Sequence, residues 1–267
     1  EATSFVFSLD AYDREQIDLA VFTGFEEMEH SELYNTPGDY LDAKRRIYKY
    51  MPIGSTIFVN RDSNHFDDIV KDCPVGIVSY GRKEGADVII NDAAMDLTGS
   101  KFELKDADGV THSIKCLIPG SFNIENVTAA FLVCQKMGVP PEDIVSEINE
   151  FPGIVGRSNI YHIIDTNSSV VIDYAHTPQS LKNQLDLIRD NIGTKKLVCV
   201  FGCGGMKSME KRPIMGAVAA KIADHVILTN DNPREEHPRK IIMDIIDGIR
   251  DLSSVEVYLD REEAIKR

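Results

Sequence analysis

Short apolar runs alternate with segments of helical periodicity along most of the chain. This alternation predicts an α/β protein with a mainly parallel sheet covered by helices. In the first half, the predicted strands are 19–23, 56–60 and 75–80, and the predicted helices are 39–50, 123–137 and 141–150. Two further strands, 101–105 and 110–118, flank the turn-forming sequence Asp106-Ala-Asp-Gly109 and predict an antiparallel hairpin added to that sheet.

The periodicity breaks at Phe151-Pro-Gly-Ile-Val-Gly-Arg157, where a proline and two glycines precede a new series of elements. The predicted strands of this second series are 170–173, 196–201 and 225–229, and its predicted helices are 178–189, 212–223 and 238–252. We therefore place a domain boundary near Gly156, which predicts one domain over 1–156 and a second over 157–267.

Composition narrows the class of protein. With 267 residues and 43% hydrophobic content, the chain is long enough for two domains that each bury a core. A formal charge of −14 disfavours nucleic acid and anionic membranes as partners, so a polyanionic ligand needs local positive groups. No apolar run approaches the roughly 18 to 20 residues of a membrane span, and the first residues lack the basic start of a signal peptide. The five scattered cysteines contain no Cys-x-x-Cys pair, which disfavours zinc and predicts free thiols in the reducing cytoplasm.

Two loops are the strongest signs of ligand binding. The apolar run 196–201 ends in Gly202-Cys-Gly-Gly205 and leads to Lys211-Arg-Pro213 at a helix start. Clustered glycines let a ligand approach the backbone, and a helix N-terminus favours anions. The next apolar run ends shortly before Asp231-Asn-Pro-Arg234. Because the carboxyl ends of parallel strands meet at one edge of a sheet, both loops are predicted to open on the same cleft.

Three more motifs accompany these loops: Gly120-Ser-Phe-Asn-Ile-Glu-Asn126, Gly156-Arg157 and Val171-Ile-Asp-Tyr-Ala-His-Thr-Pro178. In this order they resemble the Mur ligases, most closely the members that add a diamino acid. The resemblance implies a partial Mur ligase central domain over 1–156 and a Rossmann-like C-terminal domain over 157–267. It also implies an ATP- and Mg²⁺-dependent ligase of peptidoglycan synthesis. In that reaction the γ-phosphate activates a carboxylate of UDP-MurNAc-L-Ala-D-Glu as an acyl phosphate, which the amine of the diamino acid attacks.

The resemblance places the metal ligands in the first fifty residues. Lys44, in Tyr40-Leu-Asp-Ala-Lys44-Arg, matches the family lysine that becomes a carbamate, whose oxygens suit Mg²⁺. His30 and Glu1 match a metal-binding histidine and glutamate. Lys44 and His30 are therefore the catalytic candidates, and all three residues are metal candidates. Gly24 and the acidic sequence around His30 depart from the family pattern. A solvated lysine at 44 and a surface histidine at 30 stay open as alternatives.

The predicted nucleotide ligands are Asn123, Asn126, Arg157, Asp173 and His176. Asn123 and Asn126 lie at a helix start, where N–H groups and the helix dipole favour phosphate. Arg157 can clamp phosphate or ribose near the domain boundary. Asp173 and His176 follow a strand end, where they suit a ribose hydroxyl and the adenine or phosphate. Ordinary helix capping is the alternative for Asn123 and for Asp173.

The predicted amino-acid ligands are Lys207, Asp231, Asn232 and Arg234. In the family, asparagine and arginine at the last two positions hold the far carboxylate and amine of meso-diaminopimelate. Asn232 and Arg234 thus predict selection of that amino acid over L-lysine. Lys207 stands where an arginine that meets the amino acid is usual, and lysine forms no two-pronged pair with a carboxylate. A capped turn with an exposed arginine is the alternative for Asp231–Arg234.

The chain contains no Gly-x-x-x-x-Gly-Lys-Ser/Thr segment, although the family's central domain carries such a phosphate loop. Truncation is the simplest explanation, because residue 1 aligns after that loop and Arg267 precedes the family's last substrate-binding segment. A non-catalytic relative that binds a nucleotide is the alternative function. A dinucleotide-dependent oxidoreductase is disfavoured, because the glycines at 202–205 do not have the Gly-x-Gly-x-x-Gly spacing.

The missing phosphate loop predicts that the purified 267-residue chain does not catalyse ligation by itself. The measurement is phosphate release from ATP with UDP-MurNAc-L-Ala-D-Glu and meso-diaminopimelate present, and an intact diamino-acid-adding ligase serves as the positive control. Ligation product formed by the purified chain would contradict this expectation.

Overall fold

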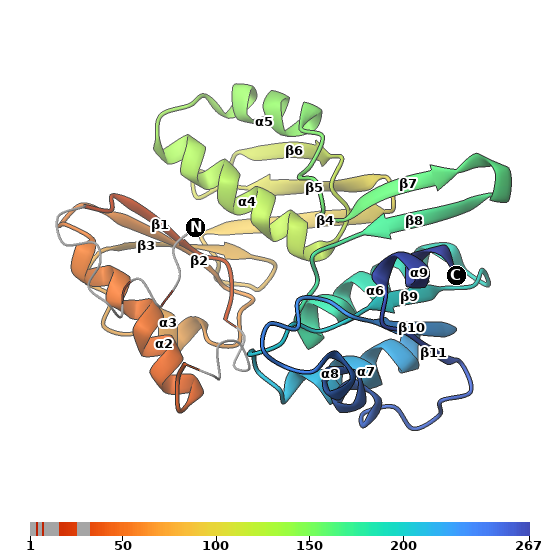
Figure 1. Ribbon diagram of the computed structural model, residues 1–267. Coiled ribbons are helices and arrows are strands. Elements are labelled where there is room, and N and C mark those ends of the chain that lie inside the picture. The colour runs from red at the N-terminus through yellow and green to blue at the C-terminus, as the bar shows by residue number, and fades with distance from the viewer. Residues whose placement is uncertain (1–3, 5–6, 8–15, 26–32) are drawn as a thin grey trace. The chain divides into compact units, whose positions relative to one another are not determined.

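The structure is a computed structural model that describes residues 4, 7, 16–25 and 33–267 (Figure 1). These residues form two compact units. One covers most of the chain up to Gly153, and the other consists mainly of Ile154–Arg267. The expected α/β class, with a mostly parallel sheet and added antiparallel strands, is confirmed.

The first unit is built on a six-stranded sheet in which the strands follow one another in chain order. The strands are β1 (Leu19–Phe22), β2 (Thr56–Asn60), β3 (Gly76–Gly81), β4 (Val88–Asp96), β5 (Gly99–Lys105) and β6 (Thr111–Cys116). Neighbours from β1 to β4 are parallel, whereas β4, β5 and β6 are antiparallel. The β5–β6 pair is the hairpin that the sequence predicts.

Helices lie against both faces of this sheet. They are α2 (Pro37–Arg45), the 3₁₀ helix η1 (Arg46–Tyr50), α3 (Phe66–Val70), α4 (Ser121–Lys136) and α5 (Pro141–Glu150). The start of α2 is fixed locally. The Thr36 hydroxyl accepts the Asp39 N–H at 3.1 Å, and the Asp39 carboxylate accepts the Thr36 N–H at 3.0 Å.

Strand β2 is buried on both faces and shows why two helical layers form. Phe58 packs in a cluster with Ile124 and Phe131 of α4. Its neighbours Ile57 and Val59 point the other way, as strand geometry requires, and pack in a second cluster with residues of α2 and α3. Figure 1 shows α4 on the side of the strands opposite α2 and α3. A continuous apolar strand is typical of a parallel sheet covered on both faces.

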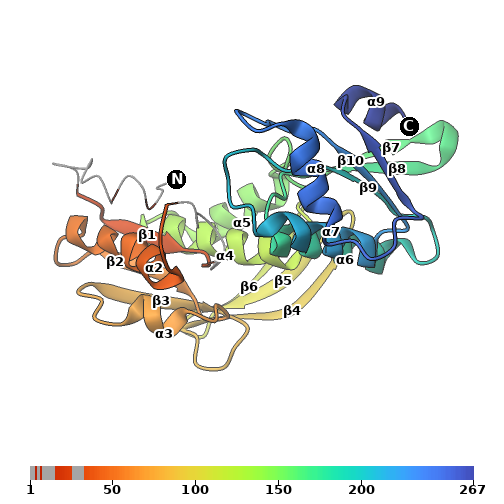
Figure 2. The ribbon, with the colours of Figure 1, turned by 60° about the horizontal axis from the view of Figure 1, so that its bottom comes forward.

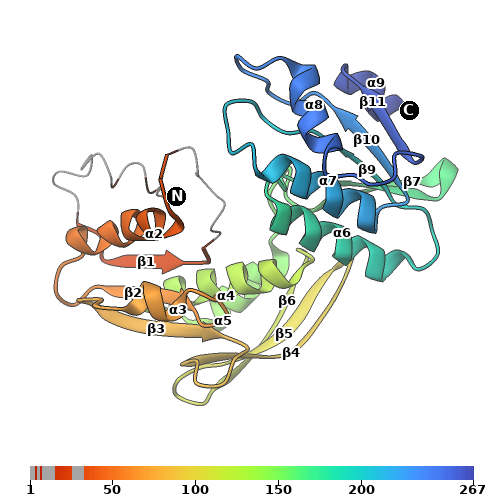
Figure 3. The ribbon, with the colours of Figure 1, turned by 90° about the horizontal axis from the view of Figure 1, so that it is seen from below.

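The second unit contains two sheets. Strands β9 (Val198–Phe201), β10 (His225–Thr229) and β11 (Val255–Tyr258) are parallel in the order β11-β10-β9, whereas β7 (Asn159–Ile163) and β8 (Ser168–Ile172) form an antiparallel pair. The helices are η2 (Ile164–Thr166), α6 (Pro178–Ile192), α7 (Lys211–Ile222), α8 (Pro238–Ile246) and α9 (Arg261–Lys266). Within this unit α6 packs on α7 and α7 packs on α8 (Figures 2 and 3).

Three expected elements differ from the structure. The helix expected over 39–50 ends at Arg45 and continues as the tighter η1. The helix expected over 238–252 ends at Ile246, just before Gly248, whose backbone lies directly against the Pro213 carbonyl. The strand expected over 170–173 pairs only with β7, so β8 is not part of the parallel sheet. The strands β4, β7 and β11 were not predicted, because many of their side chains are exposed and break the apolar pattern.

Close packing between α7 and α8 predicts an unusual effect of alanine at Gly216. A methyl group there would lie 2.2 Å from the Ile245 carbonyl oxygen, so Gly216→Ala should lower the free energy of unfolding by about 1–3 kcal/mol despite its higher helix propensity. Lys221→Ala, at an exposed position of the same helix, is the control and should change it by less than about 1 kcal/mol. Urea unfolding followed by amide NMR signals of β9 and β10 measures both. A neutral or stabilising Gly216→Ala change contradicts this account.

Candidate functional site: two loops beside β9 and β10

The loops that follow β9 and β10 lie side by side. The two strands are parallel neighbours, so both loops leave the same edge of the sheet. The Gly205 N–H donates to the Asn232 carbonyl at 2.8 Å, and the Arg234 guanidinium donates to the Gly205 carbonyl. The structure therefore brings the loop that contains Lys207 against the loop that contains Asp231, Asn232 and Arg234.

Glycine is required for this contact. A Cβ atom on Gly202 would lie 2.1 Å from the Thr229 carbonyl oxygen, and one on Gly205 would lie 1.9 Å from the Pro233 carbonyl oxygen. Real Cβ atoms do not approach backbone oxygens so closely, because the atoms would overlap. The two glycines thus let the loop backbones touch, whereas the sequence pattern was interpreted as room for a ligand; at Gly202 and Gly205 the neighbouring loop takes that room.

A buried network of ion pairs connects the two loops to α7 and α8. The Arg212 side chain is fully buried at the start of α7. Its guanidinium donates to the Glu236 carboxylate at 2.7 and 2.8 Å, to Asp244 at 2.7 Å and to the Gly204 carbonyl at 3.3 Å. Hydrogen bonds from Arg212 lower the pKa of Glu236 to about 2, and the bond to Glu236 raises the pKa of Arg212 above its already high value. The sequence motifs did not point to Glu236 or Asp244.

Asp173 orders the backbone near its strand. One carboxylate oxygen accepts the Ser158 N–H at 2.8 Å, and the other accepts the Ala175 N–H at 2.7 Å. The N-cap of α6 is Thr177, whose hydroxyl accepts the Ser180 N–H at 3.1 Å. Capping of α6 by Asp173, the alternative drawn from the sequence, is therefore wrong.

Arg157 and His176, both in the second unit, each pack against the ring of Tyr174. The Arg157 guanidinium lies 4.5 Å from the ring centre of Tyr174, and the Tyr174 and His176 rings are 4.9 Å apart. The His176 carbonyl accepts a hydrogen bond from Lys211 at 2.9 Å. Lys211 precedes the buried Arg212, so these nucleotide candidates are connected to the two-loop region through the start of α7.

Asn123 and Asn126 lie in the first unit, at the start of α4. The N-cap residue is Gly120, no side-chain cap is formed there, and the Asn123 amide donates to the Pro119 carbonyl at 2.7 Å. Ordinary N-capping by Asn123 is therefore wrong as an alternative. The Asn126 amide lies 3.5 Å from the Asn123 oxygen. A 16-residue helix whose first turn lacks a side-chain cap offers N–H groups and a positive dipole end to an anion.

A polar network that the sequence did not reveal surrounds this helix start. It lies at the carboxyl ends of β2 and β3. Glu125 accepts hydrogen bonds from Arg82 at 2.7 Å and from Asn60 at 2.9 Å, and Asp62 accepts the backbone N–H of Arg82 at 2.9 Å. The nearby Tyr80 hydroxyl is buried without a partner, and burial raises the pKa of Tyr80 strongly. Asn60 is the last residue of the predicted strand 56–60 and Asp62 follows two positions later, and this place at a strand end is the signal that could have identified them.

Lys44 lies in the last turn of α2, half-buried, with its ammonium nitrogen 4.8 Å from the ring centre of Tyr40. Its predicted partners Glu1 and His30 lie outside the described residues. Within the described part of the chain, no three His, Cys, Asp or Glu side chains are grouped so that they could hold a metal ion. The assignment of Glu1, His30 and Lys44 as metal ligands stays a prediction.

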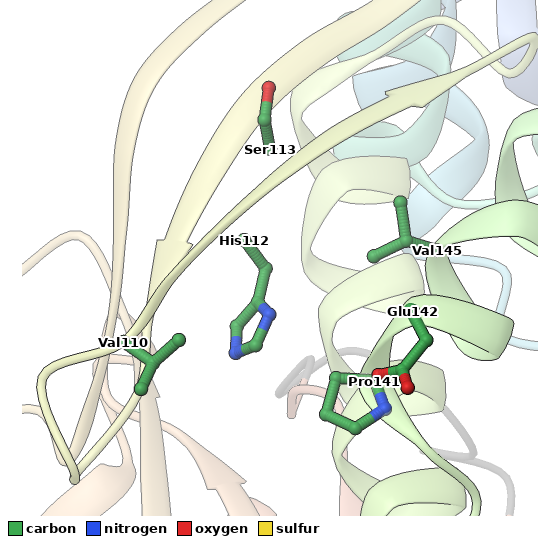
Figure 4. A pocket seen from close by; sticks show the side chains of 6 residues that line it. All are labelled: Val110, His112, Ser113, Pro141, Glu142 and Val145. Carbon is green, nitrogen blue, oxygen red and sulfur yellow. The ribbon is translucent and has the colours of Figure 1, made fainter.

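A cavity of about 520 Å³ lies elsewhere in the first unit, between the β5–β6 hairpin and α5 (Figure 4). It is lined by Val110, His112, Ser113, Pro141, Glu142 and Val145. His112 pairs with Asp106 at 2.9 Å, and its ring packs on Phe131. None of the predicted site residues lines this cavity.

The second unit thus has the architecture of an α/β ligand-binding domain, with apposed loops at the carboxyl ends of neighbouring parallel strands. Comparison with known proteins identifies the family. The model of the Mur ligase middle domain matches residues 1–134, and that of the Mur ligase glutamate ligase domain matches residues 156–267. The chain belongs to the Mur ligase family.

Two relatives show the extent of the similarity. The UDP-N-acetylmuramoyl-L-alanyl-D-glutamate--2,6-diaminopimelate ligase of Synechococcus elongatus is 36% identical over 94% of this chain and 50% of its own length. The enzyme of the same name numbered 1 in Clostridium acetobutylicum is 33% identical over 92% of this chain and 50% of its own length. The chain spans about half the length of the curated relatives it matches.

Solved structures agree on the fold. A UDP-N-acetylmuramoyl-L-alanyl-D-glutamate--2,6-diaminopimelate ligase aligns with a TM-score of 0.62 and 30% identity over 100% of this chain and 55% of its own. MurF from Acinetobacter baumannii reaches a TM-score of 0.76 at 20% identity over 94% of this chain and 52% of its own. At that identity the second match supports the fold alone.

The ion pair of Glu236 predicts a specific dependence of stability on pH. The folded pKa of about 2 lies below the value of about 4.3 for an unfolded glutamate. Ionised Glu236 therefore stabilises the fold fully above about pH 4.3, and this stabilisation is lost as the pH falls toward 2. Between those pH values, the free energy of unfolding should fall more steeply for the wild-type chain than for Glu236→Gln. Urea titrations at several pH values measure the two slopes, and equal slopes would show that the expectation is wrong.

Proposed function

We propose that this chain serves an ATP-dependent ligation that joins a diamino acid to UDP-MurNAc-L-Ala-D-Glu in cytoplasmic peptidoglycan synthesis. The observation that carries the proposal is the contact between the two loops, in which Gly205 and Asn232 share a hydrogen bond and Arg234 binds the Gly205 carbonyl. Relatives at 33–36% identity carry the name of a diaminopimelate ligase. Among the described residues no helix is both long and apolar enough to cross a membrane.

We assign the incoming amino acid to the exposed loop Asp231–Arg234 and to Lys207. The bond to the Gly205 carbonyl uses one nitrogen of Arg234 and restrains the position of the guanidinium. A guanidinium has five N–H donors, so enough remain for a two-pronged pair with a substrate carboxylate. Asn232 supplies an amide beside it. L-lysine has no second carboxylate to meet Arg234, and the proposed substrate is therefore meso-diaminopimelate.

We assign nucleotide binding to the start of α4 within the first unit and, within the second unit, to Arg157, Asp173 and His176. The N–H groups of α4 without a side-chain cap suit a phosphate, and Arg157 adds a cation in the second unit. Asp173 accepts one backbone N–H on each oxygen and keeps lone pairs for a ribose hydroxyl. When bound, ATP would supply the phosphoryl group, and Mg²⁺ held by Glu1, His30 and carbamylated Lys44 would neutralise its charge.

A chimera tests the proposed reaction. The parts of the Synechococcus elongatus relative that lie before and after its region of similarity are joined to the corresponding ends of residues 1–267. Formation of the UDP-MurNAc tripeptide from ATP and meso-diaminopimelate is then measured. The intact relative is the positive control, and the chimera with Lys44→Ala is the negative control. If the chimera does not fold, binding of meso-diaminopimelate to the 267-residue chain, followed by NMR, replaces the assay. A folded chimera that forms no product contradicts the proposal.

Arg234→Ala should abolish the preference for meso-diaminopimelate over L-lysine. Loss of a charge-assisted pair costs about 1.5–3 kcal/mol, so the affinity for meso-diaminopimelate should fall roughly 10- to 100-fold while that for L-lysine changes little. NMR titration of the chain with each amino acid gives both affinities. Arg239→Ala is the matched control, because Arg239 is also an exposed arginine but lies on α8, outside the Asp231–Arg234 loop. An unchanged ratio of the two affinities in Arg234→Ala rejects the assignment of Arg234.

A further inference from the structure

The backbone between the glycine cluster and Lys207 needs support. Met206 has a φ of +54°, in the left-handed region that residues other than glycine seldom adopt. Its side chain is 54% exposed and gives the loop little packing. The Met206 N–H, however, donates to the Glu236 carboxylate. This hydrogen bond fixes the Gly205–Met206 peptide, one residue before Lys207, from a residue thirty positions away.

Glu236 is itself held in place by Arg212. Both carboxylate oxygens of Glu236 accept hydrogen bonds from the guanidinium, at 2.7 and 2.8 Å, and the same Glu236 oxygen that takes the 2.7 Å bond also accepts the Met206 N–H. Arg212 is fully buried and also donates a hydrogen bond to a second carboxylate, that of Asp244. Two-pronged pairing with a rigid buried cation leaves the Glu236 carboxylate little freedom to rotate.

Glu236 also connects the two loops. It lies two residues after Arg234, and its own N–H donates to the Pro233 carbonyl at 2.9 Å. One residue therefore joins the end of the Asp231–Arg234 loop to the backbone that presents Lys207. Asp244, on α8, shares the guanidinium of Arg212, but its hydrogen bond to Arg212 reaches neither loop.

We propose that Glu236 is a positioning residue for amino-acid binding. By accepting the Met206 N–H while paired with Arg212, it fixes the two cations Lys207 and Arg234 relative to each other. A substrate carboxylate then meets donors that are already in place, so less ordering is needed on binding. This inference rests on the proposed function in naming the amino acid as the ligand, whereas the effect of Glu236 on the loop does not depend on it.

The test compares Glu236→Ala with Asp244→Ala in the 267-residue chain. Each change removes one carboxylate from buried Arg212, but only Glu236→Ala leaves the Met206 N–H without its acceptor. Amide hydrogen exchange of Met206 is measured by NMR relative to the amides of β9 and β10. Glu236→Ala should speed Met206 exchange about tenfold on this relative scale, and Asp244→Ala should change it less than about threefold. Met206 exchange that responds equally to both variants overturns the proposal.

Glu236→Gln provides a second variant if Glu236→Ala does not fold. Glutamine keeps an oxygen for the Met206 N–H but pairs more weakly with Arg212. The exchange rate of the Met206 amide in Glu236→Gln should therefore lie between the rates in the wild-type chain and in Glu236→Ala. If Glu236→Ala is unfolded, the rate in Glu236→Gln should exceed the rate in Asp244→Ala. Exchange at or below the Asp244→Ala level overturns the role of Glu236.

Titration with meso-diaminopimelate separates this proposal from the proposed function. The apparent dissociation constant should rise at least about fivefold in Glu236→Ala and less than about twofold in Asp244→Ala. Equal weakening in the two variants assigns Glu236 a merely structural role and overturns positioning. No binding to the wild-type chain counts against the proposed ligand, while the exchange measurement still decides whether Glu236 fixes the loop.

Discussion

The burial of the Arg212 guanidinium is the constraint on which the geometry of the second unit depends. A buried cation is costly unless its partners satisfy it, and removing one partner of such a pair costs about 3–5 kcal/mol. Arg212 has two carboxylates and a carbonyl as partners, drawn from α8, from the segment before it and from the glycine-rich loop. Because the cation cannot reach water, all three segments must be in place around it in the folded unit. The apposition of the two loops follows from that requirement.

Glycine makes the same apposition sterically allowed. Gly202 and Gly205 remove the side chains that would collide with the carbonyl groups of Thr229 and Pro233. Close backbone approach alone would leave the loop mobile, since glycine has the largest conformational freedom of all residues. The hydrogen bonds from Arg234 to Gly205 and from Met206 to Glu236 restrict that freedom. The glycines therefore allow the two loop backbones to approach each other, and the hydrogen bonds from Arg234 and to Glu236 select one arrangement of the loops.

The sequence predicted most elements of both units, because periodicity reports burial on one face. The prediction failed for strands whose exposed side chains interrupt the apolar pattern. Much of β4 is exposed, and β7 exposes Tyr161 and Ile163, so neither strand has a clear apolar pattern. The strand pattern predicted that the two loops leave the same edge of the sheet, but not that they touch each other. The clamp on Arg212 could not be predicted, since its acidic partners lie 24 and 32 residues away and nothing in their spacing marks them as a pair. Arg82 and Glu125 were not predicted for the same reason, since they lie 43 residues apart.

Each unit has an arginine that pairs with two carboxylates near the start of a helix, but the two arginines differ in their exposure to water. In the first, Arg82 joins Glu125 and Asp62 beside the start of α4, and its side chain is 34% exposed. In the second, Arg212 joins Glu236 and Asp244 at the start of α7 and is fully buried. Water screens the first network, so it contributes little to stability and can exchange partners when an anion approaches the helix. The buried network cannot exchange partners without exposing a charge in the core. The start of α4 is thus suited to a ligand that arrives and leaves, whereas the start of α7 is suited to holding fixed the two loops to which we assign the incoming amino acid.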